Sequence, residues 1–455
     1  MKIAFDKTAL IAGIGLVPWT RLGPERWFTN YKIASLYGWD LQNLADVPEV
    51  LALSDYPGSL PHLKKFTSQH LIDTPEFQAL LRNDLSGYRF LTYKPVQLPA
   101  ALKSADITLV SMNRKLTATL ENKVEFRKRF ADLSLPIPAY TVYERAALRP
   151  DVATLKTLLN GNSSVILQDE ALSGGRGTFV VATQKDLQHA LESIEVLGGG
   201  KRVVVSKHIK PARERSIQGC ATRYGVFIGP LQKQIIADPL LAHMAVPDGD
   251  RFCGAEISPD DPLSSLYPRI REYAERIGRR LLEVGYRGIF SVDYLIDESG
   301  DVYVLEVNPR LTGITPLLTA LYREHQDIPF YLLHILETAN MDYRIVDDSV
   351  SDIPPTGSLM VVHGHNSRTA AMIKAPHSGF YEGGRFLSQA CRLDGSEHHL
   401  VQRYSPPGFP IKPGGRLFSV FSRQPILDDN DVLLPRAVKV VKYLQKNTNL
   451  EELAV

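Results

Sequence analysis

Residues 289–310 read IFSVDYLIDESGDVYVLEVNPR. Two apolar runs, Ile289–Ile296 and Val302–Val307, flank the short acidic segment 297–301, which contains one glycine. β-Branched and aromatic residues on both sides of such a loop predict an antiparallel β-hairpin.

Polar side chains interrupt this apolar hairpin. In an antiparallel pair Asp293 and Glu306 can fall opposite each other, and Asn308 lies on the face of Glu306 because strand side chains alternate. A bare carboxylate is costly to bury unless it binds a cation. Three oxygen donors on one patch suit Mg²⁺, which fills its remaining positions with phosphate and water. Arg310 continues this face and could hold a phosphate or a carboxylate in a fork.

The alternative interpretation is a surface hairpin whose acidic side chains are exposed to solvent and bind nothing. It accounts for the acids of the loop, but not for Glu306, which stands between Leu305 and Val307. An acid flanked by apolar neighbours on a strand needs a partner, so we favour the metal site.

The composition is that of a globular protein with several domains. Its 455 residues suggest about three domains, and 52 basic against 50 acidic residues argue against a nucleic-acid-binding surface. The three cysteines are too few and too scattered for a disulfide framework or a zinc site, which points to a reducing cytosol. No stretch approaches the ~20 apolar residues of a membrane span.

The first 115 residues predict a small α/β domain, with apolar strands at residues 8–17, 50–53 and 107–111. Gly13 and Gly15 form half of a dinucleotide-binding fingerprint. We interpret them as a tight turn at the end of the first strand, because no third glycine follows.

A glycine-rich loop between two strands is the second feature that suggests chemistry. An amphipathic helix is predicted over residues 117–133, followed by strands at 165–168 and 178–183. Between these strands, Gly174, Gly175 and Gly177 allow the backbone to fold closely over a phosphate chain, and Arg176 adds a cation.

The rest of the chain shows elements without obvious catalytic residues. Two strands are predicted at 224–228 and 232–237, separated by Gly229-Pro230, and an amphipathic helix at 266–284. Residues 346–357 form the best candidate linker. The histidines beyond it lack a further ligand at useful spacing, so we interpret them as polar surface or as neighbours of a site.

These parts, in this order, resemble the ATP-grasp superfamily of carboxylate–amine ligases. The resemblance covers about residues 115–340, and its most specific piece is Glu306-Val307-Asn308-Pro309-Arg310. It implies an α/β fold (the α+β ATP-grasp class). The implied domains are an N-terminal α/β pre-ATP-grasp domain (1–115), a two-lobed ATP-grasp domain (116–345) and a small C-terminal α/β domain (356–455).

The resemblance also implies roles for individual residues. Metal ligands would be Asp293, Glu306 and Asn308, and Arg310 would steady the acyl phosphate. Arg176 is our second candidate for a catalytic residue, from its position in the loop. Nucleotide contacts would come from the lysine helix, the lid strand, the lid and the hinge, namely Lys123, Gln168, Gly174, Gly175, Gly177, Lys207, Ile209 and Glu214. The implied cofactors are ATP and Mg²⁺, with Mn²⁺ as the alternative metal.

One position departs from the family pattern. The strand before the lid usually carries a lysine that contacts the ATP phosphates, and Gln168 stands there. Glutamine can donate a hydrogen bond but brings no charge. Our hypothesis is that Arg176 supplies the missing charge; otherwise ATP binding is weak.

Within the superfamily, the size and three-part layout fit biotin carboxylase. However, the segment Leu311-Thr312-Gly313-Ile314 continues differently from that family after the arginine. The segment 228–232, Cys253-Gly254 and a final domain of about 100 residues look more like peptide ligases that carry a pre-ATP-grasp domain.

The resemblance therefore predicts an ADP-forming ligase that activates a carboxylate as an acyl phosphate and joins it to an amine. The expected partners are a small-molecule carboxylate and an amine, as in amino acids or peptides, with no nucleic acid and no membrane. The expectation allows a homodimer and places the protein in the cytoplasm. Two alternatives stay open: a non-catalytic ATP-binding regulatory module, favoured only by Gln168, and a small-molecule kinase.

Overall fold

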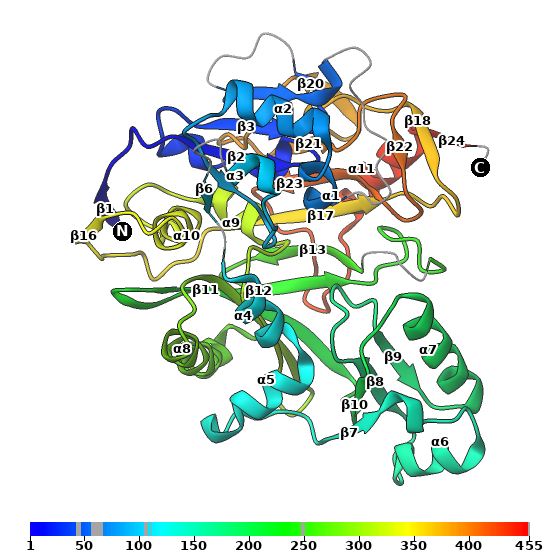
Figure 1. Ribbon diagram of the computed structural model, residues 1–455. Helices are drawn as coiled ribbons and strands as arrows, with labels where there is room; N and C mark the ends of the chain where they lie inside the picture. The colour runs from blue at the N-terminus through cyan, green and yellow to red at the C-terminus, as the bar shows by residue number, and fades with distance from the viewer. Residues whose placement is uncertain (42–46, 56–66, 104–107, 111, 247–250, 454–455) are drawn as a thin grey trace.

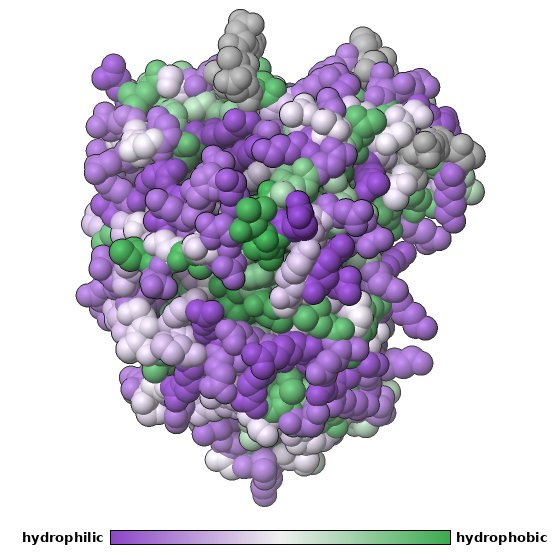
Figure 2. Space-filling model, turned by 90° about the vertical axis from the view of Figure 1, so that its left-hand side faces the viewer, coloured by the Kyte–Doolittle hydropathy of each residue, from purple (hydrophilic) through white to green (hydrophobic). Residues whose placement is uncertain are grey.

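The computed structural model describes residues 1–41, 47–55, 67–103, 108–110, 112–246 and 251–453. Its centre is a long antiparallel sheet, with a parallel sheet above it and a smaller antiparallel sheet at its lower right in Figure 1. The face that carries the N-terminus, shown in Figure 2, gathers hydrophobic residues in a band at mid-height between hydrophilic areas.

The N-terminal segment forms a parallel α/β layer, as predicted. Its sheet has the order β4-β3-β2-β5-β6 in the described chain. The strands are β2 (Ile11–Gly15), β3 (Lys32–Ser35), β4 (Glu49–Ala52), β5 (Arg89–Leu91) and β6 (Thr108–Val110). The helices are α1 (Ser68–Ile72), α2 (Pro75–Asp84) and α3 (Ala100–Lys103). Residues 107 and 111 of the predicted strand 107–111 lie outside the described residues.

The prediction of a tight turn at Gly13 is wrong, because Gly13 lies inside β2, and Gly15 is the last residue of that strand. A side chain at Gly13 would clash with the Tyr31 hydroxyl, and one at Gly15 would displace the end of the Arg21 side chain. Close packing of neighbouring side chains against the strand, rather than a turn, explains these glycines.

A four-stranded antiparallel sheet of order β7-β10-β8-β9 carries the glycine-rich loop. Its strands are β7 (Tyr140–Glu144), β8 (Val165–Asp169), β9 (Thr178–Val181) and β10 (Arg202–Lys207), and its helices are α6 (Val152–Leu159) and α7 (Gln184–Val196). Thr183 and Asp186 form a reciprocal capping box that begins α7.

The central sheet holds the hairpin of residues 289–310 at one end. Its order among the described residues is β15-β14-β11-β12-β13-β17-β23-β21-β19-β20. The first five strands are β11 (Ala212–Thr222), β12 (Gly225–Ile236), β13 (Phe252–Ile257), β14 (Gly288–Asp297) and β15 (Val302–Asn308). The others are β17 (Gly357–His363), β19 (Gly379–Glu382), β20 (Arg385–Ser388), β21 (His399–Arg403) and β23 (Arg416–Ser422).

The segment after the predicted linker does not fold apart from the rest. β17 pairs with β13 from Gly254↔Met360 to Ile257↔Gly357, so one sheet runs from the predicted ATP-grasp segment into the C-terminal segment. Smaller sheets pair β1 (Lys2–Phe5) with β16 (Tyr343–Asp347), and order β22 (Pro410–Ile411), β18 (Ala370–Lys374) and β24 (Asn449–Glu452). α11 (Pro435–Lys446) packs into the core of the C-terminal strands. The domain limits themselves stay a prediction.

Helices cover both faces of the central sheet where it carries the hairpin. α8 (Tyr267–Glu283) buries Ile270, Ala274 and Ile277 against one face, together with Ile217 and Val292. α10 (Phe330–Thr338) packs on the other face against Cys220 and Ile289. Because side chains alternate along a strand, Ile289 and Phe290 enter different cores. α9 (Thr315–Leu321) connects the hairpin to α10.

The single helix predicted over residues 117–133 is wrong. The chain forms α4 (Arg114–Glu121) and α5 (Lys123–Arg129), followed by one short turn of 3₁₀-helix. Asn122 has an extended backbone (ψ 121°), and its side chain accepts hydrogen bonds from the N–H groups of Val124 and Glu125. It therefore ends one helix and caps the next.

The two strands predicted on either side of Gly229-Pro230 are one strand, β12. Ile217 pairs with Leu231 and Gly219 with Ile228, so Gly229 and Pro230 together face Gln218 in a bulge. A bulge tolerates proline inside a strand because the residue has no N–H to donate to the ladder.

No helix among the described residues is long and apolar enough to cross a membrane.

A buried arginine joins β11 to two acids far apart in the sequence. Arg215 is fully buried; its Nε donates to Asp261 (2.8 Å) and its Nη1 to Asp431 (2.8 Å). We predict that Arg215→Met lowers the free energy of unfolding by about 3–5 kcal/mol, because two carboxylates lose their buried partner. Urea denaturation measures this.

The matched control is Arg279→Met, since Arg279 is exposed and pairs with Glu275 at 3.7 Å on the surface of α8. We expect a change within ~0.5 kcal/mol there. Equal losses of stability in the two variants would contradict the role of Arg215.

Candidate ATP and metal site

The predicted hairpin forms, and a bulge between Asp293 and Tyr294 sets its register at the polar cluster. β14 and β15 pair antiparallel, with Asp293 directly opposite Glu306 and Ser291 opposite Asn308. Asn308 Nδ2 donates to Asp293 Oδ2 (2.9 Å) and lies 3.4 Å from Glu306 Oε1. Asn308 thus contacts both of the other proposed metal ligands, which lie opposite each other.

A residue that the sequence did not indicate also holds this cluster. Gln234 Nε2, on β12, donates to Asp293 Oδ1 (2.8 Å) across the intervening strand β11. On β11, Ser216 lies opposite both Asp293 and Gln232, so Gln234 reaches Asp293 diagonally from two residues further along β12. Only the strand order brings these residues together, so no local pattern could have identified Gln234.

The electrostatics of the cluster favour a bound cation. Loss of hydration, and then the neighbouring charge of Glu306, raise the pKa of Asp293 to about 7. Two carboxylates placed opposite each other repel, and a divalent cation between them removes that cost. Two carboxylates and an amide oxygen are hard donors, so these residue types fit Mg²⁺. The Asn308 amide, whose nitrogen faces the carboxylates and whose oxygen accepts from Arg310, would turn its oxygen toward the cation.

Lys123 connects the metal cluster to the base of the glycine-rich loop. It is the first residue of α5 and is only 5% exposed. Its Nζ donates to the carbonyl of Leu172 (2.7 Å) and lies 3.7 Å from Glu306 Oε2. The structure therefore brings this lysine, which is unremarkable in the sequence alone, to the predicted site.

The glycines of the loop have different structural reasons. Gly174 and Gly175 have φ of 72° and 74°, a conformation that favours glycine. A Cβ on Gly177 would lie 2.8 Å from that of Leu172 and 2.9 Å from that of Asp169, so a side chain does not fit. Together they form a tight tip between β8 and β9.

Gln168 and Arg176 lie on this same hairpin. Gln168 Nε2 donates to Thr178 Oγ1 (3.3 Å), across the β8–β9 pair. Arg176 Nε donates to the carbonyl of Ser173 (3.0 Å), within the loop. The guanidinium therefore belongs to the part of the loop that would cover phosphates.

Arg310 lies directly beside the metal cluster. Its Nη2 donates to Asn308 Oδ1 (2.9 Å), and its Nε is paired with Glu121 at the end of α4. Glu121 was not indicated by the sequence, because nothing in its helix distinguishes it from a surface acid.

The hinge residues follow the strand β10. The N–H of Lys207 donates to the carbonyl of Ala139 (2.9 Å), and Ile209 is half-buried in the loop that leads to β11. Glu214 lies on β11 opposite Leu295, so it shares the sheet face of Asp293. Burial raises the pKa of Glu214 to about 7.

These features, a glycine-rich hairpin facing a carboxylate-bearing sheet, define an ATP-grasp domain. The family model described as ATP-grasp domain matches residues 120–314. This part of the chain is therefore an ATP-grasp domain, as predicted, and the mixed α/β fold class is confirmed. The small separate C-terminal domain stays a prediction.

Carbamoyl phosphate synthases are among the curated relatives. The arginine-specific large chain of Bacillus subtilis is 22% identical over 323 residues, which cover 69% of this chain and 28% of that protein. The large chain of Rubrobacter xylanophilus is 22% identical over 284 residues, covering 62% of this chain and 25% of that protein. This chain thus spans about a quarter of the length of these relatives.

Solved structures resemble the chain over nearly its whole length. Biotin carboxylase of Campylobacter jejuni, in complex with β-γ-ATP, has a TM-score of 0.59 at 14% identity, covering 91% of this chain and 87% of that one. The biotin carboxylase domain of Hydrogenobacter thermophilus 2-oxoglutarate carboxylase, with MgADP and bicarbonate, has a TM-score of 0.57 at 14% identity, covering 91% and 86%. At this identity the likeness concerns the fold.

We predict that Arg176→Ala weakens ATP binding by about 10- to 100-fold, because a charged hydrogen-bond donor to phosphate is lost next to the uncharged Gln168. Isothermal titration calorimetry with a non-hydrolysable ATP analogue measures the affinity. Lys185→Ala is the matched control, since Lys185 is an exposed cation at the start of α7 in the same lobe, and should leave affinity unchanged.

The double substitution sharpens this test. Adding Gln168→Lys to Arg176→Ala should restore affinity, because a charge returns to the strand position beside the loop. A harmless Arg176→Ala, together with unchanged affinity in Gln168→Lys, would refute the compensation.

Proposed function

We propose that the protein is an ATP-dependent, ADP-forming carboxylate–amine ligase that acts on an amino acid or a peptide. The observation that carries the proposal is the contact between Asp293, Glu306 and Asn308, with Lys123 and Arg310 on either side. This cluster lies within a domain whose family model is that of ATP-grasp.

The first step activates a carboxylate, which is a poor electrophile because its leaving group would be oxide. A carboxylate oxygen attacks the γ-phosphorus of ATP, a new O–P bond forms, and the bond from the γ-phosphorus to the β-phosphate oxygen breaks. The products are an acyl phosphate and ADP.

In the second step an amine attacks the carbonyl carbon of the acyl phosphate. The C–N bond forms, the C–O bond to phosphate breaks, and the amine loses a proton. Closure of the loop around Gly174–Gly177 would keep water away from the acyl phosphate.

The chain's own residues would hold the charge that develops in these steps. Asp293, Glu306 and Asn308 would hold Mg²⁺, which neutralises charge on the transferring phosphoryl group. Arg310 adds a fixed donor beside them, and Pro309 restricts the backbone that aims it. The ion pair with Glu121 and the hydrogen bond to Asn308 also fix the direction of the Arg310 guanidinium.

An amino acid or peptide is the proposed substrate class. The segment Leu311–Ile314 departs from the biotin carboxylase pattern, which supports a substrate other than that of the structural relatives. Thr315 at the start of α9 donates to Gln218 (2.7 Å) and fixes this segment against the sheet.

The decisive assay measures ADP release with pairs of amino acids or short peptides, followed by mass spectrometry for a new amide. We expect one amide for each ADP. ADP with a phosphorylated product and no amide would identify a kinase. ATP binding without turnover on any tested pair would identify a non-catalytic module.

We predict that Glu306→Ala lowers turnover by about a hundredfold or more, because a metal ligand between Asp293 and Lys123 is lost. ADP formation under saturating ATP measures this, and circular dichroism verifies the fold. Glu298→Ala is the control, since Glu298 is an exposed acid in the loop of the same hairpin. Wild-type turnover in Glu306→Ala would remove the basis of the proposed function.

A further inference from the structure

A cavity of about 640 Å³ lies apart from the proposed ATP site and shares no lining residue with the cluster of Asp293, Glu306 and Asn308. It is enclosed by residues 226–231 of β12, the start of α8, the segment from α9 to α10, and residues 348–355. Its volume falls in the range of roughly 300–1,000 Å³ that is typical of ligand sites.

The cavity faces the edge of a β-strand. β12 pairs with β11 from Gly225 to Lys233, but with β13 only from Lys233 to Ile236. In the described parts of the chain, the other edge of residues 226–231 therefore has no strand partner. Every residue from Val226 to Leu231 lines the cavity. Neighbouring side chains of a strand point to opposite faces of the sheet, so a cavity on one face would be lined by every second residue. Because all six consecutive residues line this cavity, it faces the backbone edge of the strand.

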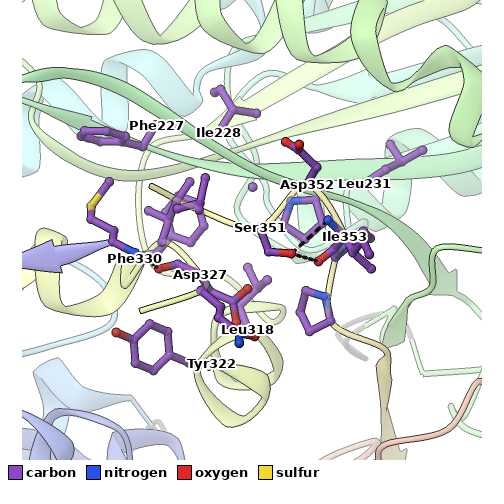
Figure 3. Close-up of a pocket in the computed structure, with 18 of the residues that line it drawn as sticks. Phe227, Ile228, Leu231, Leu318, Tyr322, Asp327, Phe330, Ser351, Asp352 and Ile353 are labelled. Atoms are coloured by element: carbon purple, nitrogen blue, oxygen red, sulfur yellow. Dashed lines mark hydrogen bonds between the residues drawn. The ribbon is translucent and has the colours of Figure 1, made fainter. Parts of the chain in front are cut away.

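The packing on the two sides of β12 supports this geometry. Ile228 belongs to the core under α8, whereas its neighbour Phe227 packs against the core under α10. Both line the cavity, as Figure 3 shows for these two residues and Leu231 along the strand. The cavity thus lies between the helices on the two faces of the sheet, at its open edge. Tyr267, from α8, donates to the carbonyl of Gly229 (2.9 Å).

The remaining walls combine apolar side chains with an acidic rim. Leu318, Tyr322 and Phe330 form the wall opposite β12, and the segment of Ser351, Asp352 and Ile353 closes one end (Figure 3). This segment is anchored by the N–H of Ser351 to the carbonyl of Gln326 (2.8 Å). Asp348 and Asp352 are exposed on the rim. The two cations that also line the cavity have partners, since Arg271 pairs with Glu275 (3.0 Å) and the Met1 ammonium donates to the carbonyls of Asp327 and Ser349.

We propose that the cavity binds a short extended peptide whose apolar side chains alternate with lysine or arginine, and that the peptide adds as a strand to residues 226–231. An unpaired strand edge offers backbone donors and acceptors to a second strand. The bulge at Gly229-Pro230 limits this edge, because Pro230 has no N–H and the Gly229 carbonyl already accepts from Tyr267. The peptide ladder would therefore form along residues 226–228, and Leu231 would continue it beyond the bulge. The apolar walls receive its apolar side chains, and Asp348 and Asp352 attract its cations. The binding needs no ATP.

Isothermal titration calorimetry of the full chain with a blocked pentapeptide, in which three valine or leucine residues alternate with two lysines, tests the proposal. We expect saturable binding of one peptide per chain. The same peptide with N-methyl groups on alternate backbone amides should bind about tenfold more weakly or worse, because it cannot form the ladder. Absence of binding, or equal binding of both peptides, would overturn the proposal.

Variants of the chain locate the site. Leu318→Trp fills the cavity and should abolish binding of the pentapeptide, while Val196→Trp, on an exposed position of α7, should leave it unchanged. Unchanged binding in Leu318→Trp would place the peptide elsewhere and overturn the proposal. If Leu318→Trp does not fold, the comparison of the unmodified and the N-methylated peptide on the wild-type chain still tests the proposal.

The same measurement separates this site from the proposed enzyme function. Glu306→Ala, which removes a proposed metal ligand, should bind the pentapeptide as the wild type does. Loss of peptide binding in Glu306→Ala would show that the peptide depends on the proposed metal cluster, and would overturn the proposal of a separate peptide site.

Discussion

The register of β14 against β15 places two carboxylates opposite each other, and several neighbouring groups offset the repulsion between them. Asp293 and Glu306 stand directly opposite each other. Like charges at such a position are costly, and the pKa of Asp293 rises because of the lost hydration and the charge of Glu306. Asn308, Gln234 and Lys123 each direct a donor or a positive charge at the pair. These neighbours make the cluster suited to a cation and keep it in one geometry.

The central sheet separates two environments. One face of its hairpin end is apolar and is covered by α8, and the other presents Glu214, Asp293 and Glu306. The glycine-rich loop belongs to a different sheet, so a firm connection to the metal cluster needs residues outside both sheets. Lys123 provides one through Leu172 and Glu306. The N–H of Lys123 adds another by donating to the carbonyl of Glu170 (2.9 Å).

Local patterns predicted the elements that depend on neighbours in the sequence. The capping box of Thr183 and Asp186 follows from their spacing. The opposition of Asp293 and Glu306 depends on a bulge, because the loop length sets Tyr294 opposite Val304 and the register shifts by one residue between Tyr294 and Asp293. The errors occurred where one residue serves two elements. Asn122 ends α4 and begins α5 with an apolar pattern on both sides, which a single helix also explains. The sequence around Pro230 predicts the end of a strand, but the strand continues because Gly229 and Pro230 form a bulge opposite Gln218.

The sequence alone determined the hairpin, because two apolar runs around a short acidic loop pair without any other part of the chain. A bulge between Asp293 and Tyr294 decided that Asp293 and Glu306 share a face, since the loop length by itself would put Glu306 opposite Val292 on the other face. The tertiary structure decided which groups complete the site. Gln234 reaches Asp293 across a third strand, Glu121 orients Arg310 from α4, and the edge of β12 stays open because β13 pairs with only its last residues. These contacts join residues that are 59, 189 and about 20 positions apart, and no local pattern encodes such distances.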